Sequence, residues 1–162
     1  MGQWELWSWS NGLGEDSIAK FPKLRELRIR RCPMLVGKLP TFLPSLEELD
    51  IDGCPLLVDL PKVLPSLLTL SIRQCQEVVL RSVSNTTSIT TLKIVGVSGL
   101  VRLDEAHIKT LGSLEVLEIW NCDKLRCLWA DGINSNYLTN LKRLEISNEL
   151  RSGLSNLKSL KD

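Results

Sequence analysis

Apolar residues recur along this chain in the pattern L-x-x-L-x-L, which occurs six times. Its three slots hold Leu24, Leu46, Leu67, Ile89, Leu114 and Leu141, then Leu27, Leu49, Leu70, Leu92, Leu117 and Leu144, and then Ile29, Ile51, Ile72, Ile94, Ile119 and Ile146. The alternation in the L-x-L part predicts a short strand with one apolar face. The copies recur about every 21 to 27 residues, and such a period predicts a stack of similar coils.

The stack predicts the fold class, because one coil cannot bury its own apolar face and depends on its neighbours. We expect an α/β solenoid with a parallel sheet on its concave side. All seven prolines fall between Pro22 and Pro65, so the early outer arcs, Gly37–Pro44 and Asp59–Pro65, should be extended or turn-like. Later arcs should contain short helices: Glu105–Leu111, capped by Asp104 and stopped by Gly112, and a similar segment at Asn134–Asn140.

The pattern also predicts where the array begins and ends. About six coils occupy residues 21–147. Residues 1–20 are interpreted as the tail of a preceding repeat or a ragged N-terminal segment. Residues 148–162 are expected to be irregular or to form a short helix, since Leu150, Leu154 and Leu157 share one helical face. A seventh copy beginning at Leu157 is the alternative, although it follows Leu141 too closely for a normal coil.

Four of the five cysteines occupy one further slot, eight places after the first leucine: Cys32, Cys54, Cys75 and Cys122. We interpret them as small residues that stack where each strand ends. An odd number of cysteines without a secretory signal indicates reduced thiols. Cys127 lies outside the column and is left unassigned. With His107 as the only histidine, we expect no catalytic site, no metal site and no cofactor.

Composition narrows the functional class. The chain has 162 residues, of which 32 are leucine, and a formal net charge of +1. Such a chain has no basic field for nucleic acid. It also lacks an apolar run long enough to cross a bilayer, so we expect no membrane span. Because the first residues do not resemble a secretory signal, we expect a cytoplasmic protein.

Binding residues are expected on the concave side, between and after the core leucines. The candidates are Arg28, Asp50, Ser71, Lys93, Glu118 and Glu145 in one column and Arg30, Asp52, Arg73, Val95, Trp120 and Ser147 in the next. Arg28–Asp50 and Arg30–Asp52–Arg73 are alternatively simple cross-strand charge pairs. Trp120 is either an interface anchor or an aromatic packed over Val95.

The aligned consensus resembles leucine-rich repeats over residues 21–147. A narrower resemblance, to plant coiled-coil nucleotide-binding leucine-rich-repeat (NLR) disease-resistance proteins, rests on Trp4-Glu5-Leu6-Trp7, Phe21-Pro22, Cys32-Pro33, Leu39-Pro40, Leu43-Pro44-Ser45-Leu46 and Leu64-Pro65-Ser66-Leu67. The resemblance implies a protein-interaction module that recognises a pathogen effector or a guarded host protein. It also implies contact with the receptor's own nucleotide-binding domain, which the repeats hold inactive.

This chain departs from that architecture, because it contains no G-x-x-x-x-G-K-[ST] phosphate loop. We therefore expect a fragment that lacks the nucleotide-binding domain. The alternative function is a generic leucine-rich-repeat adaptor, such as the substrate-recognition arm of a ubiquitin ligase. Neither class is an enzyme.

Overall fold

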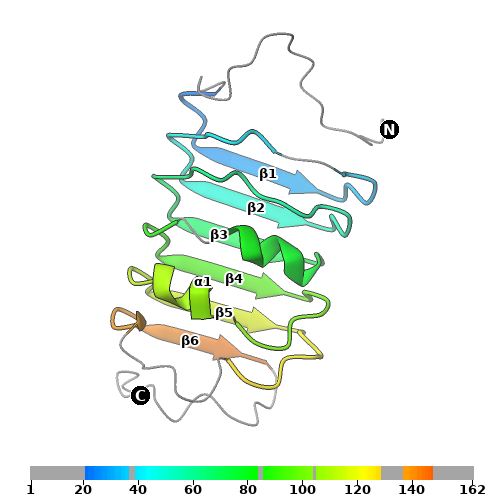
Figure 1. The fold of residues 1–162 in the computed structure, drawn as a ribbon, viewed down its shortest axis with the longest axis vertical. Coiled ribbons are helices and arrows are strands. Elements are labelled where there is room, and N and C mark those ends of the chain that lie inside the picture. The colour runs from blue at the N-terminus through cyan, green and yellow to red at the C-terminus, as the bar shows by residue number, and fades with distance from the viewer. Residues whose placement is uncertain (1–20, 37–38, 84–85, 104, 129–136, 148–162) are drawn as a thin grey trace.

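The computed structural model describes residues 21–36, 39–83, 86–103, 105–128 and 137–147. Within them six parallel strands form one sheet in sequential order. The strands are β1 (Glu26–Arg30), β2 (Glu48–Asp52), β3 (Thr69–Arg73), β4 (Thr91–Val95), β5 (Val116–Trp120) and β6 (Arg143–Ile146). Figure 1 shows them stacked from one end of the molecule to the other. The predicted solenoid is therefore confirmed.

The register of the sheet follows the sequence repeat. Leu49 pairs with Leu70, and Ile51 pairs with Ile72, and the same slots are paired between every other pair of neighbouring strands. Because alternate side chains of a strand point to opposite faces, each leucine and isoleucine of the L-x-L pattern faces the arcs. Those of β2 to β5 are buried. They form one continuous apolar core with the first leucine of each repeat.

A left-handed residue ends each of the first five strands. These residues are Arg31, Gly53, Gln74, Gly96 and Asn121, with φ between 49° and 66°. The first four donate their backbone N–H to the carbonyl of the last residue in the next strand, at 2.7 to 3.0 Å. The sharp turn thus extends the ladder by one hydrogen bond and sends the chain out of the sheet. Glycine adopts this conformation without strain, yet it occupies only two of the five positions.

The outer arcs differ along the stack, as the prolines predict. In the first two arcs Phe42 and Val63 form an isolated parallel bridge, and no helix is present among the described residues. The third arc contains a 3-10 helix, η1 (Glu77–Val83), which was not predicted from the sequence. In the fourth arc, α1 (Glu105–Thr110) confirms the predicted helix. Figure 1 shows η1 and α1 on the same face of the sheet.

Several predicted features lie outside the described residues. They are the segments 1–20 and 148–162, the cap at Asp104, and residues 134–136 of the segment Asn134–Asn140. The described part of that last segment begins at Tyr137, in a single 3-10 residue. These predictions stay predictions.

The cysteine column belongs to the core, as proposed from its spacing. Cys54, Cys75 and Cys122 are buried, whereas Cys32 in the first coil is half-buried. The Sγ of Cys75 donates to the backbone oxygen of Arg73 at 3.2 Å, and Cys122 donates to Trp120 at 3.5 Å. Burial raises the pKa of the Cys54 thiol to about 11. Burial also raises the pKa of the Cys75 and Cys122 thiols. The three buried thiols are therefore protonated at neutral pH, and such thiols are poor nucleophiles and metal ligands.

Candidate protein-binding surface

One face of the sheet carries the side chains that alternate with the core, and we call it the open face. Its three columns are Glu26, Glu48, Thr69, Thr91, Val116 and Arg143; then Arg28, Asp50, Ser71, Lys93, Glu118 and Glu145; and then Arg30, Asp52, Arg73, Val95 and Trp120. Two of these columns were predicted. The structure places their members on neighbouring strands in the expected order, with Ser147 just beyond the last strand.

The first column was not among the binding residues predicted from the sequence. It was detectable, because each member precedes the second leucine of a repeat and therefore alternates with the core. Its charged members take part in the ion pairs of the open face. Arg28 pairs with both Glu26 and Glu48, and Arg143 pairs with Glu145. The hydrogen bond to Glu145 is the main reason why the pKa of Arg143 is raised.

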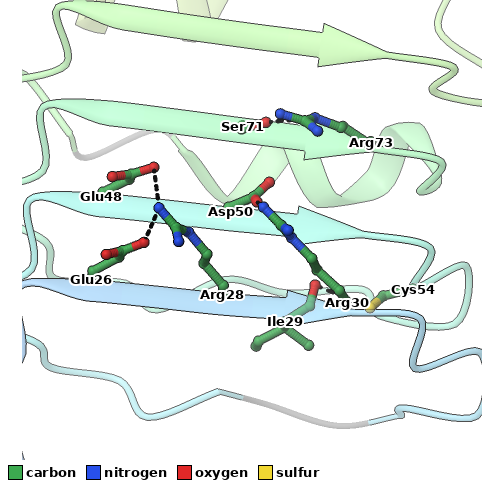
Figure 2. A network of polar contacts seen from close by, with 9 residues as sticks. All are labelled: Glu26, Arg28, Ile29, Arg30, Glu48, Asp50, Cys54, Ser71 and Arg73. Carbon is green, nitrogen blue, oxygen red and sulfur yellow. Dashed lines mark hydrogen bonds and ion pairs between the residues drawn. The ribbon is translucent and has the colours of Figure 1, made fainter.

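The open face contains a buried carboxylate on β2. Asp50 is only 3% exposed. Its Oδ2 accepts hydrogen bonds from Arg30 Nε at 3.0 Å and from an outer Arg30 nitrogen at 2.5 Å. This hydrogen bonding, followed by the attraction between the two charges, raises the pKa of Arg30. Figure 2 shows Arg30 reaching from β1 across to β2.

The observed charge pairs differ from the expected ones. Arg28 does not pair with Asp50, and no ion pair joins Asp52 to Arg30 or Arg73 in the described part of the sheet. Arg30 instead reaches diagonally to Asp50, while Arg73 donates from Nε to the Oγ of Ser71 at 3.1 Å. The physical reason is burial, because a carboxylate removed from water needs a charged donor more than an exposed one does. Arginine is long enough to take the diagonal route.

The second half of the open face is also paired. Lys93 Nζ lies 3.0 Å from a Glu118 carboxylate oxygen, and Arg143 lies 3.9 Å from the other oxygen of Glu118. The charges of this face are thus largely satisfied by neighbours within the sheet. The more exposed pairs of the open face, such as Arg28 with Glu48, contribute about 0–1 kcal/mol each. They leave the face polar.

Trp120 is the large aromatic side chain of this surface. It ends β5 beside Val95 of β4 and is 39% exposed. Part of the indole is therefore covered and part of it stays in water. Aromatic side chains with this partial exposure, surrounded by polar groups, are frequent anchors of protein interfaces.

The described residues were searched for metal sites, membrane-spanning helices and hollows. They contain no group of three or more His, Cys, Asp or Glu side chains arranged to hold a metal ion. No helix among them is long and apolar enough to cross a membrane. Two shallow hollows beside η1, of about 330 and 450 Å³, share Glu77 and Arg81 as lining residues.

Comparisons with known proteins agree with the geometry. A family model described as RPS2-like plant disease resistance proteins, leucine-rich repeats, matches residues 9–150. The disease resistance RPP13-like protein 1 of Arabidopsis thaliana is 36% identical over 115 residues, which are 67% of this chain and 11% of that protein. The disease resistance protein RGA1 of Solanum bulbocastanum is 35% identical over 111 residues, which are 65% of this chain and 11% of that protein. No solved structure gave a significant match.

The chain thus spans only a small part of the length of these relatives. The family model, by contrast, covers most of the chain, including all six strands. The chain belongs to the leucine-rich repeats of RPS2-like plant disease resistance proteins.

Proposed function

We propose that this chain is the protein-interaction region of an intracellular plant immune receptor, and that its open face is the binding surface. One observation carries the proposal: in the described part of the chain, six strands present a polar face on which most of the charged side chains pair with neighbours in the sheet, and Trp120 of that face is 39% exposed. Family membership supports a role in defence against pathogens.

Two kinds of protein partner follow from the family. One is a pathogen effector or a guarded host protein, which the receptor detects. The other is the receptor's own nucleotide-binding domain, which the repeats hold inactive in the cytoplasm until detection. A partner that displaces the pairs of the open face competes with any domain bound there. One surface can in this way serve both recognition and inhibition.

The test is charge reversal on the open face, and the structure decides which charges to reverse. R30E would set a carboxylate against the buried Asp50 and disturb the fold. R73E is better, because Arg73 hydrogen bonds only to a hydroxyl in the described sheet. W120A removes the aromatic anchor. The matched control is R25E on the flank, where Arg25 is 76% exposed and pairs with Glu47 at 3.5 Å.

The chain is co-expressed in leaf cells with the nucleotide-binding region of a matching disease resistance protein. Co-precipitation and the defence response are both measured. We expect wild type and R25E to bind and to restrain the response, while R73E/W120A binds at least tenfold less, as expected for loss of an interface anchor. Equal binding by R73E/W120A and wild type would refute the proposal.

A further inference from the structure

One carboxylate oxygen in the open face lacks a donor. Asp50 Oδ1 is buried, and no hydrogen-bond partner reaches it from the described residues. The other carboxylate oxygen, Oδ2, accepts both hydrogen bonds from Arg30. Figure 2 shows one Asp50 oxygen on the Arg30 guanidinium and the other turned toward β3. Because buried polar atoms are almost always paired, an acceptor left in this way indicates a missing donor.

A second carboxylate lies beside it. Asp52 follows two residues later on the same strand and face, and it forms no ion pair with the described arginines of β1 and β3. Two such residues are about 6.6 Å apart along a strand. A nitrogen about 2.8 Å from one oxygen of each carboxylate bridges about 5.6 Å. A small cation that lies between these two residues can therefore reach one oxygen of each carboxylate.

The neighbouring strand completes the arrangement. Ser71 is the register partner of Asp50, and Arg73 is the register partner of Asp52. The Ser71 hydroxyl supplies a third oxygen on the β3 side. Arg73 donates a hydrogen bond from Nε to this hydroxyl. A hydrogen bond to a neutral acceptor is weaker than one to a charged acceptor. The side chain of Arg73 can therefore turn outward at small cost and open the site.

These acceptors select among cations. Three oxygens on neighbouring residues of β2 and β3 match an ammonium group, which is compact and has three donors in a tetrahedral arrangement. A guanidinium is planar and suited to two oxygens of one group. Asp50 cannot offer that pair, because Oδ2 is occupied by Arg30. A guanidinium can therefore bind in this way only to Asp52, and it would leave Asp50 Oδ1 without a donor.

We propose that the open face accepts a lysine side chain of a protein partner, with the ammonium bound between Asp50 Oδ1, the Asp52 carboxylate and Ser71 Oγ. Arg73 acts as the gate and turns outward when the lysine enters. That the lysine belongs to a protein partner rests on the proposed function. The affinity of the site for an ammonium group depends only on the residues named here.

The test uses the full 162-residue chain and three blocked tripeptides, Ac-Gly-Lys-Gly-NH2 and its arginine and glutamine counterparts. The carboxyl carbons of aspartate are labelled with ¹³C, and their NMR signals are followed during titration at low salt. We expect the lysine peptide to shift the signals of Asp50 and Asp52 saturably. The glutamine peptide should leave them unchanged.

Two variants remove the site and one serves as its control. D52N removes a partly exposed charge, and D50N replaces the unpaired acceptor by an amide whose carbonyl can keep the Arg30 hydrogen bond. Each should weaken binding of the lysine peptide about tenfold or more, the usual effect of losing a hydrogen bond to a charged group. E48Q removes an equal charge from the same strand and face, where Glu48 pairs with Arg28 at 3.6 Å. It should leave binding unchanged, while R73A should tighten it.

Several results would overturn the inference: no shift at Asp50 with the lysine peptide, equal shifts with the arginine peptide, or equal weakening by E48Q and D52N. If D50N does not fold, as judged by its thermal midpoint, D52N decides. Failure here is distinct from failure of the proposed function. Lysine binding with unchanged protein binding by R73E/W120A would refute only the latter.

Discussion

The stacked coils predict that one substitution has different costs at different places in the array. Leu70 fills the second slot of the third coil, is fully buried, and packs between Leu49 and Leu92 of the adjoining strands. In Leu70→Ala three carbons are lost, which costs about 2.4 kcal/mol of transfer free energy at about 0.8 kcal/mol per carbon. The cavity adds to this, because neighbours on both sides hold their positions. We expect a loss of about 4 kcal/mol, within the range for buried leucines.

The same slot in the last strand should be less sensitive. Leu144 is only partly buried, and its described neighbour is Leu117 on one side. Since a repeat array is stabilised by interfaces between nearest neighbours, the end coil loses one interface where a central coil loses two. Leu144→Ala should cost about half as much as Leu70→Ala. The matched control is Leu68→Ala in the third coil, where Leu68 is 44% exposed, with an expected cost of about 1 kcal/mol.

The assay is urea unfolding of the three variants and the wild type, followed by circular dichroism at several protein concentrations. The free energy of unfolding and its dependence on urea are fitted together, because a changed slope would report loss of an end coil rather than of the whole array. Equal losses in Leu70→Ala and Leu144→Ala would refute the nearest-neighbour reasoning. A large loss in Leu68→Ala would refute the assignment of the core face.

Three further predictions concern the turns, the arcs and the thiols. Gln74 has a left-handed backbone with φ 49°, so Gln74→Gly should raise the urea midpoint by relieving about 1 kcal/mol of strain. Gly53→Ala should lower the midpoint by a similar amount, because Gly53 is also left-handed. An unchanged midpoint in either variant would contradict this reasoning. Ser66 donates from Oγ to the Pro44 carbonyl at 2.8 Å, so Ser66→Ala should cost about 1 kcal/mol in the same assay, and a neutral result would show that the bond adds nothing. Burial raises the pKa of Cys54 to about 11 from an ordinary 9.0, so the thiol ionises at lower pH in the unfolded chain than in the folded one. The free energy of unfolding should therefore fall as pH rises from 9 toward 11. Cys54→Ala should show a smaller fall. An identical pH profile for both proteins would count against the burial of this thiol.

The repeat explains why so much of the fold was predictable. A strand, a turn and an arc occur in each copy, so the same local structure is predicted six times from six different stretches of sequence. The prolines of the early arcs predicted extended or turn-like segments there, and a capping residue predicted the helix at Glu105–Thr110. Both predictions follow from local rules of the backbone. The helix η1 was missed because its segment, Glu77–Val83, is short and carries no capping pattern. Its charged first and last turns, Glu77 and Arg81, were the available signal.

The candidate surface was predictable in position but not in chemistry. Alternation placed Arg28, Asp50 and Arg73 on one face, and the register confirms their order. Which charges pair depends on how deeply each carboxylate is buried and on how far each arginine reaches. Neither quantity is contained in a one-dimensional pattern. The diagonal contact between Arg30 and Asp50 therefore emerged only from the packed sheet.

By itself the sequence determined the number of strands, their register and the residues of the core, because each of these follows from a periodic apolar pattern that a solenoid repeats in space. Only the tertiary structure decided that Asp50 is buried, that one of its oxygens has no donor in the described sheet, and that Trp120 stays partly in water. The physical reason is that burial and pairing depend on side chains from three adjacent coils at once. Those side chains are about 20 to 40 residues apart along the chain and become neighbours only when the coils stack.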